Sequence, residues 1–474
     1  MRGRSGCFGN PKPTNPKLVN RRKKGDVMAI SATTSLAEFI SNVRELPAVV
    51  CERAKLHIAD TLACIYAGSA SRAAALAKQI SAREDECARI IVPGLGRWND
   101  PALAALLTGV CAHADDFDDT SEHSMNGHPS APIVSALIPT ACMLGASGTD
   151  VVRAYAVGVE VACKLGVAVG PAHTSRGWHT MSTLGTLGAA AAAANLRGLD
   201  AVQTQHAVGI ACSFAGGLLG NTGTMTKALH CGRAAHGGYL AAALAEQGFT
   251  AGADILEAEA GFIDALTDRS VDRIDLPGLG GDWELLRPGL AVKLYPCCSC
   301  THLAIDGAIE IKGRHTFDPS SIERITCSVR EECTHYLRFP NPRNGIEAKF
   351  SMTYTVAVAL TRGKVTLEDF ETTALDREDV AVLVPKVRMV ACFDENEVGS
   401  IEVVLKDGQR FATRRAAPHG SPDDPPEWDD IIGKLRQSVA RGTSCVPQQL
   451  EEFFVAIRGM DKLSKFVDLL ETYL

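Results

Sequence analysis

The chain has 474 residues, of which 46% are hydrophobic, and this is enough for a large core and two domains. Its net charge is −7, but residues 1–27 hold eight basic residues and one acid, so the remaining 40 basic and 54 acidic residues give −14. A net charge this negative on residues 28–474 argues against nucleic acid as a partner. The 16 cysteines lack disulfide-like spacing, which indicates a reduced compartment, and no apolar run reaches the roughly 18–20 residues that span a membrane.

Residues 1–27 combine glycine, proline and asparagine with the basic run Arg21 to Lys24, and this predicts a disordered basic tail. Its origin has two explanations. It is either an organelle-targeting segment or a non-native or mis-assigned start before Met28. The lack of an amphipathic face favours the second explanation. We therefore expect a cytoplasmic protein, and a mitochondrial one if the tail is native and the source is eukaryotic.

Residues 28–265 predict helices throughout, because apolar residues recur at helical spacing, as in Ala54 to Ile65. Asp200 stands where a helix is expected to begin. Two runs consist almost entirely of small residues, Gly185 to Ala194 and Ala234 to Ala245. Small side chains let helices approach closely, so we expect these two helices at the centre of a bundle.

The pattern changes in residues 266–420. Alternating apolar residues predict a strand at Ile322 to Val329. Two more strands, Ile401 to Leu405 and Arg410 to Arg414, flank a Lys-Asp-Gly-Gln turn and predict a hairpin. Val356 to Leu360 predicts one helical turn between strands, so this region is expected to be an α+β domain.

Residues 421–474 form the last predicted segment. It begins within the Pro/Asp-rich linker Pro418 to Pro426 and returns to helical periodicity from Trp428 onward. We expect this last segment, from Trp428 onward, to pack against the first helices. The predicted fold class is therefore mainly α with an α+β second domain, in which N- and C-terminal segments together form a helical bundle.

The stretch His113 to Pro129, HADDFDDTSEHSMNGHP, concentrates acids and histidines beside the apolar run Ala131 to Leu144. Burying such groups next to a core helix is costly unless they are paired or used. If Asp116 to Thr120 is helical, these two side chains share a face, and His128, held extended by the following proline, can join them at one cavity. A solvated acidic loop with a capping role is the alternative.

Two other stretches place basic groups near helix starts. His179 lies in a Gly-Trp-His turn before the first small-residue run, so we expect its imidazole at a helix N-terminus, where the dipole favours anions and lowers a histidine pKa. Lys227 opens the helix of the second small-residue run and must reach water or meet an anion. A structural histidine and a lysine that reaches solvent are the alternatives.

Lys293 begins the run KLYPCCSCTH. Three cysteines and a histidine in residues 297–302 suggest zinc, but adjacent cysteines point apart and the spacing differs from C-x(2–4)-C, so we expect buried thiols instead. Farther on, residues 335–351, HYLRFPNPRNGIEAKFS, mix charges of both signs after a strand. Such loops often carry sites, although a solvated surface loop explains the pattern equally well.

Five motifs, taken in order, resemble the MmgE/PrpD family over residues 35–470. They are D-F-D-D-T…H-P-S at 116–130, G-W-H at 177–179, K-x-L-H-x-G-x-A-A at 227–235, K-L-Y-P-C-C at 293–298 and G-I-E-A-K-F-S at 345–351. The family includes 2-methylcitrate dehydratase, cis-aconitate decarboxylase and iminodisuccinate epimerase. The resemblance implies an enzyme without metal or cofactor, a smaller α+β lid domain inserted into the helical domain, and a homodimer.

The resemblance also implies which residues form the active site. The expected catalytic residues are Asp116, Thr120, His128 and His179, and the expected substrate-binding residues are Lys227, Lys293 and Tyr336. Tyr336 rests on the resemblance alone, through its fixed distance from the Glu-Ala-Lys of residues 347–349. The sequence departs from the family pattern at Ser121, where a tryptophan is usual, and at Ala131, where the dehydratases tend to carry an acid. Both departures argue against 2-methylcitrate as the substrate.

The activities of this family all form negative charge on a carbon next to a carboxylate, and the enzyme must stabilise that charge. We expect Lys227 and Lys293 to bind the carboxylates of a small anionic substrate, with Tyr336 as a neutral donor and His179 on another carboxylate oxygen. The expected activity is a metal-independent lyase that dehydrates or decarboxylates a citrate- or aconitate-like acid, with epimerisation of a dicarboxylate as the alternative.

Proton transfer is expected from His128 and Asp116, because each proton step needs a group whose pKa is tuned near neutral. Thr120 would orient Asp116 or a substrate oxygen. Two rival classes remain. Residues 115–119 also fit the D-D-x-x-D magnesium motif of terpene synthases, but the 5% aromatic content and the α+β region argue against it. A non-catalytic member of the fold is the other rival, against which the presence of all candidate residues argues.

Overall fold

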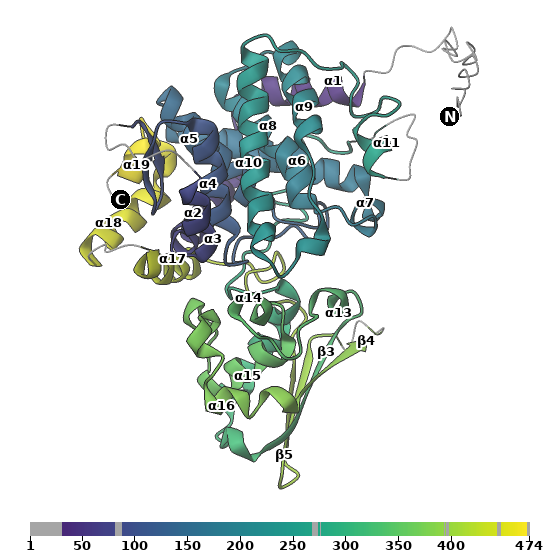
Figure 1. The fold of residues 1–474 in the computed structure, drawn as a ribbon, viewed down its shortest axis with the longest axis vertical. Helices are drawn as coiled ribbons and strands as arrows, with labels where there is room; N and C mark the ends of the chain where they lie inside the picture. The colour runs from purple at the N-terminus through teal and green to yellow at the C-terminus, as the bar shows by residue number, and fades with distance from the viewer. Residues whose placement is uncertain are drawn as a thin grey trace, which may run out of the picture.

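The computed structural model describes residues 31–80, 88–267, 274, 276–392, 394, 398–442 and 447–471, so the predicted basic tail lies outside the described residues. A larger helical body lies above a smaller α+β domain (Figure 1). One hydrophobic core draws on residues 32–294 and 428–470, and a second core draws on residues 295–411. This confirms the predicted fold class, with an α+β domain between two helical segments.

The helical body contains most of the regular structure. Its elements in chain order are α1 (Ala32–Asn42), α2 (Ala48–Ser69), α3 (Arg72–Gln79), β1 (Ile90–Val92), β2 (Gly96–Trp98), α4 (Pro101–His113), α5 (Ser130–Leu144), α6 (Gly148–Val169), α7 (Pro171–Ser175), α8 (Thr180–Arg197), α9 (Ala201–Phe214), α10 (Met225–Glu246), α11 (Phe262–Leu266), α17 (Trp428–Gly442), α18 (Pro447–Arg458) and α19 (Val467–Glu471). As predicted, Asp200 caps α9, and its side chain accepts a hydrogen bond from the Gln203 backbone N–H.

The two small-residue helices, α8 and α10, lie at the centre of this body. Helix α10 packs against α8, α4 and α9, and α8 packs against α5 and α6. A Cβ added to Gly238 of α10 would lie 2.4 Å from the Cβ of Ala189 in α8. A Cβ at Gly109 of α4 would lie 2.8 Å from the Cα of Gly232 in α10. The backbones approach too closely for larger side chains, which confirms the predicted position of the two runs.

The hairpin of β1 and β2 was not expected in a region predicted to be helical. Its strands have three residues each, and all three residues of β1 are buried. A strand buried on both faces shows no polar–apolar alternation, so its sequence cannot be told from a helix segment by periodicity. Gly94 in the turn and Gly96 at the start of β2 have φ values of 76° and 93°, which favour glycine.

The second domain is built around a four-stranded sheet of order β4-β3-β5-β6. Its elements are α12 (His302–Arg314), β3 (Ile322–Arg330), α13 (Cys333–Tyr336), α14 (Gly345–Ala348), α15 (Met352–Arg362), α16 (Glu378–Ala381), β4 (Val387–Cys392), β5 (Ser400–Leu405) and β6 (Arg410–Arg414). β3 pairs parallel with β4 and antiparallel with β5, and β5 and β6 form the predicted hairpin. Helices α12 and α15 pack against each other and against the sheet. The helix predicted at residues 356–360 is present between β3 and β4, but it is longer than the single turn expected, since these residues are part of the eleven-residue helix α15.

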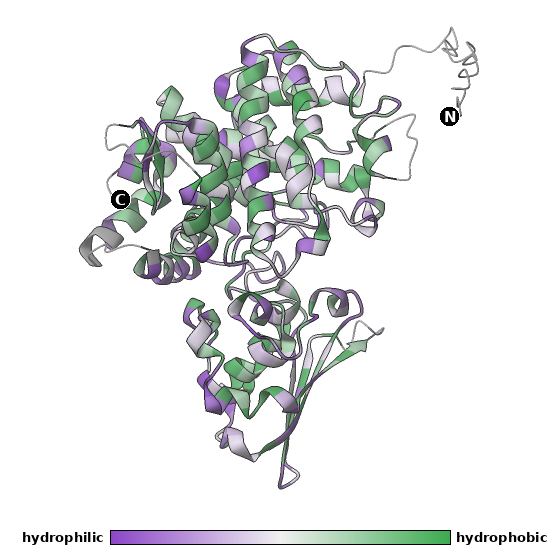
Figure 2. Ribbon diagram, in the orientation of Figure 1, coloured by the Kyte–Doolittle hydropathy of each residue, from purple (hydrophilic) through white to green (hydrophobic). Residues whose placement is uncertain are grey.

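The C-terminal segment packs back on the helical body, as predicted, with α17 against α2. Lys434 of α17 is buried and reaches the loop between α4 and α5 and the segment before α12, donating hydrogen bonds to the carbonyl oxygens of Phe117 at 2.5 Å and Lys293 at 3.0 Å. Its ammonium also pairs with Asp60 of α2 at 2.6 Å. Hydrophobic residues are concentrated inside the body, whereas the β5–β6 turn is hydrophilic (Figure 2). Among the described helices, none combines the length and apolar character that a membrane crossing requires.

Candidate active site

A cavity of about 570 Å³ lies where the helical body meets the second domain. Its walls come from the loop after α4, the starts of α8 and α10, the segment before α12, and the region from the end of β3 to α13. All seven residues expected from the sequence line it: Asp116, Thr120, His128, His179, Lys227, Lys293 and Tyr336. Segments more than 200 residues apart in the chain therefore contribute to one cavity.

Asp116 does not lie on a helix, so the predicted helical spacing of Asp116 and Thr120 is wrong. The residue has a positive φ of 53° in an irregular loop. Its carboxylate accepts hydrogen bonds from Lys227 Nζ at 2.5 Å and from Lys293 Nζ at 3.0 Å. Burial alone would raise the pKa of Asp116, but the two ammonium groups outweigh it and hold that pKa well below its usual value. Two cations brought by distant segments hold this loop conformation.

The two lysines enter the cavity from different elements. Lys227 lies in the first turn of α10, which Thr224 caps through its side-chain oxygen. Lys293 is buried and also donates to the Asp116 carbonyl oxygen at 2.9 Å. Burial opposes its charge, but the Asp116 and Asp118 carboxylates outweigh burial and raise the pKa of the Lys293 ammonium. Lys293 therefore remains cationic, and its ammonium shares the Asp116 carboxylate with that of Lys227.

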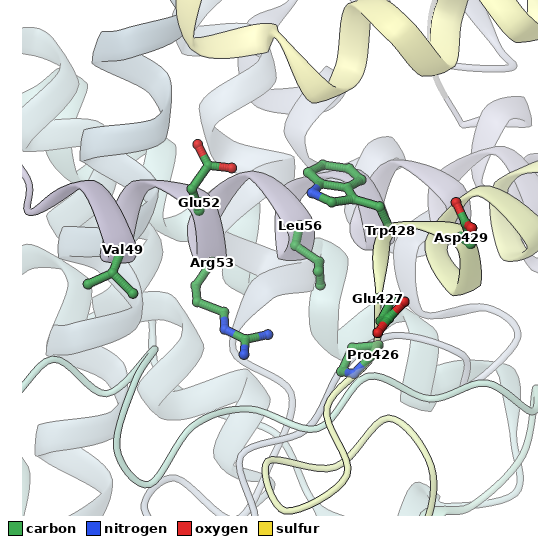
Figure 3. Close-up of a pocket in the computed structure, with 8 residues that line it drawn as sticks. All are labelled: Val49, Glu52, Arg53, Leu56, Pro426, Glu427, Trp428 and Asp429. Carbon is green, nitrogen blue, oxygen red and sulfur yellow. The ribbon is translucent and has the colours of Figure 1, made fainter.

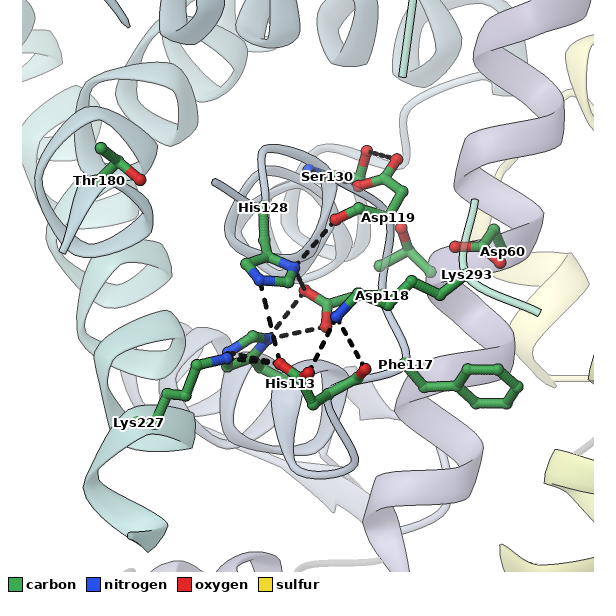
Figure 4. A network of polar contacts seen from close by, with 12 residues as sticks. Asp60, His113, Phe117, Asp118, Asp119, His128, Ser130, Thr180, Lys227 and Lys293 are labelled. Atoms are coloured by element: carbon green, nitrogen blue, oxygen red, sulfur yellow. Dashed lines mark hydrogen bonds and ion pairs between the residues drawn. The ribbon is translucent and has the colours of Figure 1, made fainter. Parts of the chain in front are cut away.

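His113, at the end of α4, is a central residue that the sequence reasoning did not select. Its Nδ1 lies 2.7 Å from Asp118 Oδ1, and its Nε2 lies 2.7 Å from Lys227 Nζ (Figure 4). Burial, followed by the nearby Lys227 charge, lowers the pKa of His113 to about 3 although Asp118 opposes this. The available signal was its place at the head of the acid-rich stretch, five residues before Asp118.

His128 lies just before α5 and has its Nδ1 3.0 Å from the Asp119 carbonyl oxygen and 3.3 Å from Asp118 Oδ2. A carbonyl or carboxylate oxygen can only accept, so Nδ1 carries a proton. The opposite nitrogen, Nε2, lies 4.0 Å from Asp116 Oδ1. Nearby, Thr120 Oγ1 is buried and has no hydrogen-bond partner among the described residues, although Thr120 lines the cavity. A substrate oxygen could satisfy this hydroxyl.

His179 is the residue that immediately precedes α8, as the sequence predicts. Its Nδ1 lies 3.0 Å from His230 Nδ1, and His230, on α10, was not selected from the sequence. Burial, followed by the Lys227 charge, lowers the pKa of both imidazoles. The two rings therefore stay neutral, one donating to the other, at a helix N-terminus that favours an anion.

Tyr336, at the end of α13, is the second domain's expected contribution. It lines the cavity and its hydroxyl hydrogen-bonds to Asn126 of the acid-rich loop. Burial raises the pKa of Tyr336, so its hydroxyl stays protonated and can donate. Arg343 and Glu347, from the same predicted loop, pair with each other at 2.7 Å and do not line the cavity.

Lys349 also stays outside the cavity, but it joins the two domains. Its ammonium donates to Asp115 Oδ1 at 2.6 Å, and Arg441 of α17 donates to Asp115 Oδ2 at 2.8 Å. Asp115 immediately precedes Asp116, so the same turn of loop binds the second domain and anchors the cavity lysines. The interdomain contact and the cavity charges are thus built on adjacent residues.

Among the described residues, one group brings three metal-ligand atoms within 4.8 Å of one another: His113, Asp118 and His128. A tetrahedral zinc site with bonds of about 2.1 Å separates its ligand atoms by roughly 3.4 Å. Here Asp118 lies 2.7 and 2.9 Å from His113 Nδ1, and the Lys227 ammonium occupies the other ring nitrogen. The group is a hydrogen-bond network and does not fit a metal ion in this arrangement. In the cysteine run, Cys297 and Cys298 are buried as expected, whereas Cys300 is only partly buried, and Cys298 and Cys300 line the cavity.

A second hollow, of about 430 Å³, lies between α2 and the start of α17 (Figure 3). Its lining residues are Val49, Glu52, Arg53, Leu56, Pro426, Glu427, Trp428 and Asp429. The lining holds three carboxylates and a single arginine, and it contains no histidine or lysine. Its charge does not suit an anionic ligand, so the first cavity remains the candidate site.

Two family models cover most of the chain. The MmgE/PrpD N-terminal domain matches residues 34–274, and the MmgE/PrpD C-terminal domain matches residues 295–457. Curated relatives include proteins named cis-aconitate decarboxylase. The one from Mus musculus is 30% identical over 435 residues, 88% of each chain. The one from Homo sapiens is 30% identical and covers 88% of this chain and 89% of its own, and one from Aspergillus terreus is 27% identical and covers 95% and 97%.

Proposed function

The chain belongs to the MmgE/PrpD family, and from that membership and the geometry of the cavity we propose that it is a metal-independent lyase that decarboxylates cis-aconitate or a closely similar tricarboxylate. The observation that carries the proposal is the meeting of Lys227 and Lys293 at Asp116, in one cavity with His128 and His179. The names of the relatives support decarboxylation over dehydration.

The cavity suits a small polyanion. Each ammonium has three N–H donors, and the hydrogen bonds described above leave one on Lys227 free to meet a substrate carboxylate. His179 at the start of α8 and the Tyr336 hydroxyl are neutral donors for other carboxylate oxygens. Because the rest of the chain is acidic, these local cations make the cavity selective for its anion.

Decarboxylation breaks the bond between a carboxylate and the substrate carbon, and CO2 leaves while the electron pair stays on that carbon. The charge is delocalised into the neighbouring unsaturated carboxylate system, whose oxygens the ammonium of Lys227 and the donors around it stabilise. A proton must then reach the carbon. His128 is suited to deliver it from Nε2 in the doubly protonated form of its ring, because Nδ1 keeps its own proton bonded to Asp119 and Asp118 while Nε2 lies on the side of Asp116.

Asp116 receives a different role from the proton transfer that the sequence suggested. A carboxylate whose pKa lies well below its usual value is a weak base, so it is a poor proton acceptor near neutral pH. Its two short contacts make it the anchor that keeps both ammonium groups in place. Thr120, whose hydroxyl lacks a partner among the described residues, then orients a substrate oxygen rather than Asp116.

The test is proton NMR of the purified protein in D2O with cis-aconitate, citrate, 2-methylcitrate and iminodisuccinate in separate samples. We expect cis-aconitate to be consumed, with release of CO2 and a product that carries deuterium on carbon, and we expect the same rate in excess chelator. Consumption of citrate or 2-methylcitrate with loss of water would replace decarboxylation by dehydration. Deuterium exchange in iminodisuccinate without net conversion would indicate an epimerase. No reaction with any of the four would contradict the proposal.

A further inference from the structure

His113 lies between a group that can only accept hydrogen bonds and a group that can only donate them. On one side, Nδ1 is 2.7 and 2.9 Å from the two oxygens of the Asp118 carboxylate. On the other side, Nε2 is 2.7 Å from the Lys227 ammonium (Figure 4). The ring has no exposed surface, so water cannot replace either partner.

These partners allow one protonation state. A carboxylate accepts, so Nδ1 must carry a proton, and an ammonium donates, so Nε2 must offer its lone pair. His113 is then a neutral imidazole in a single tautomer. Because its ring bonds to both groups, it holds the Lys227 ammonium in a fixed position relative to the Asp118 carboxylate. The buried carboxylate and the ammonium are each satisfied through one ring.

The same carboxylate also orients the second imidazole. Asp118 Oδ2 lies 3.3 Å from His128 Nδ1, and the His113 and His128 rings meet edge to face with centroids 4.6 Å apart. Both Nε2 atoms lie 4.0 Å from Asp116 Oδ1. One aspartate therefore directs two histidines toward the point where the lysines meet.

Lys227 shows what this arrangement achieves. Its ammonium donates to His113 Nε2 and to Asp116 Oδ1, and these two directions fix the third N–H. Without His113 the ammonium would be held by Asp116 alone and would be free to rotate on a flexible side chain. Misplacing such a group by about 1 Å can cost roughly 100-fold in rate.

We propose that His113, held by Asp118, is a positioning residue for the reaction proposed above, and that it aims one N–H of Lys227 at a substrate carboxylate. The inference rests on the proposed function for its role in turnover. Its geometric part, the neutral Nδ1–H tautomer bonded to Lys227, stands independently of any substrate.

The first experiment needs no substrate: 15N NMR of the histidine rings at pH 7 in the wild type and in Lys227→Met. We expect a His113 ring that is neutral and protonated at Nδ1, and an Nε2 signal that moves when Lys227 is replaced. A charged ring, a proton on Nε2, or an Nε2 signal that Lys227→Met leaves unchanged would overturn the proposal. His173, another buried histidine, which contacts Thr183 at 3.0 Å, serves as the control ring that Lys227→Met should not affect.

The second experiment is a double-mutant cycle on the decarboxylation of cis-aconitate and on equilibrium binding of citrate. His113→Phe keeps a ring of similar size, and we expect it to lower kcat/KM about 100-fold in the wild-type background but less than about threefold with Lys227→Met. Equal losses in both backgrounds would reduce His113 to a structural residue. His113→Gln, whose amide both donates and accepts, should recover part of the activity and covers the case in which the phenylalanine variant does not fold. A wild type that shows the expected tautomer but no turnover would refute the proposed function and leave the geometry standing.

Discussion

His302, the first residue of α12, allows a quantitative test of the buried neutral histidines. Its Nε2–H donates to the Cys297 carbonyl oxygen at 3.3 Å, and the side chain is buried. Burial, followed by the nearby Lys293 ammonium, lowers the pKa of His302 to about 3 from its ordinary 6.5. The folded protein therefore leaves this ring neutral at pH values where the unfolded chain protonates it.

The sign and size of the effect follow by linkage. A histidine with a lowered folded pKa contributes stability that is present above pH 6.5 and is lost as the pH falls toward 3. The loss is about 1.4 kcal/mol per pH unit inside that window, and it reaches about 2 kcal/mol at pH 5. His302→Phe keeps a buried ring but cannot titrate. Its unfolding free energy, relative to the wild type, should therefore improve by about 2 kcal/mol between pH 7.5 and pH 5.

The assay is urea unfolding followed by circular dichroism at constant ionic strength, with the transitions of the two cores fitted separately. His315→Phe, at an exposed histidine just after the same helix, is the matched control for the exchange of a histidine for a phenylalanine. Parallel pH curves for the wild type and His302→Phe would refute the reasoning, because they would mean that the folded protein binds a proton at His302 as easily as the unfolded chain.

Three further predictions concern the cavity and its support. His128→Ala should lower turnover about 100-fold or more with little change in affinity, whereas Lys227→Ala should lose both; equal and mild effects on kcat and KM would contradict these roles. Lys434→Met should lower the unfolding free energy by about 3–5 kcal/mol because it leaves the buried Asp60 carboxylate unpaired, and adding Asp60→Leu should restore part of the loss in urea unfolding. Asp116→Asn removes a negative charge between two ammonium groups, so calorimetry should show citrate bound roughly fivefold more tightly, while turnover should fall because the ammonium groups lose their anchor; an unchanged turnover would argue against the anchoring role.

Local patterns were enough to predict much of the fold. The small-residue runs of α8 and α10 and the alternation in β3 reflect burial that each segment shows in its own sequence. The failures are equally physical. The hairpin β1–β2 is too short and too buried to alternate. The helical geometry expected for residues 116–120 is replaced by a loop whose conformation depends on lysines 111 and 177 residues away in the chain.

The candidate site was only partly predictable for the same reason. The seven residues named from the sequence all line the cavity. Six of them lie in stretches that their residue types and positions had singled out, and Tyr336 came from the family resemblance alone. His113 and His230 were missed because histidines inside apolar helices are usually structural, and only their partners show otherwise. Lys434 was missed because it bonds to Phe117 across 317 residues.

An acid-rich loop can form the wall of an anion site only if its own carboxylates are ion-paired or hydrogen-bonded, and the four aspartates of this loop meet that condition. Each of the four aspartates bonds to two partners: Asp115 to Lys349 and Arg441, Asp116 to Lys227 and Lys293, Asp118 to His113 and His128, and Asp119 to His57 and Ser130. The partners of Asp115 and Asp116 are lysine and arginine side chains, so four positively charged side chains from distant segments bind this loop. Because burial keeps the His113 and His179 rings neutral, the positive charge in the cavity resides on Lys227 and Lys293. The acids therefore determine where those lysines stand, and the lysines determine which substrates the cavity attracts.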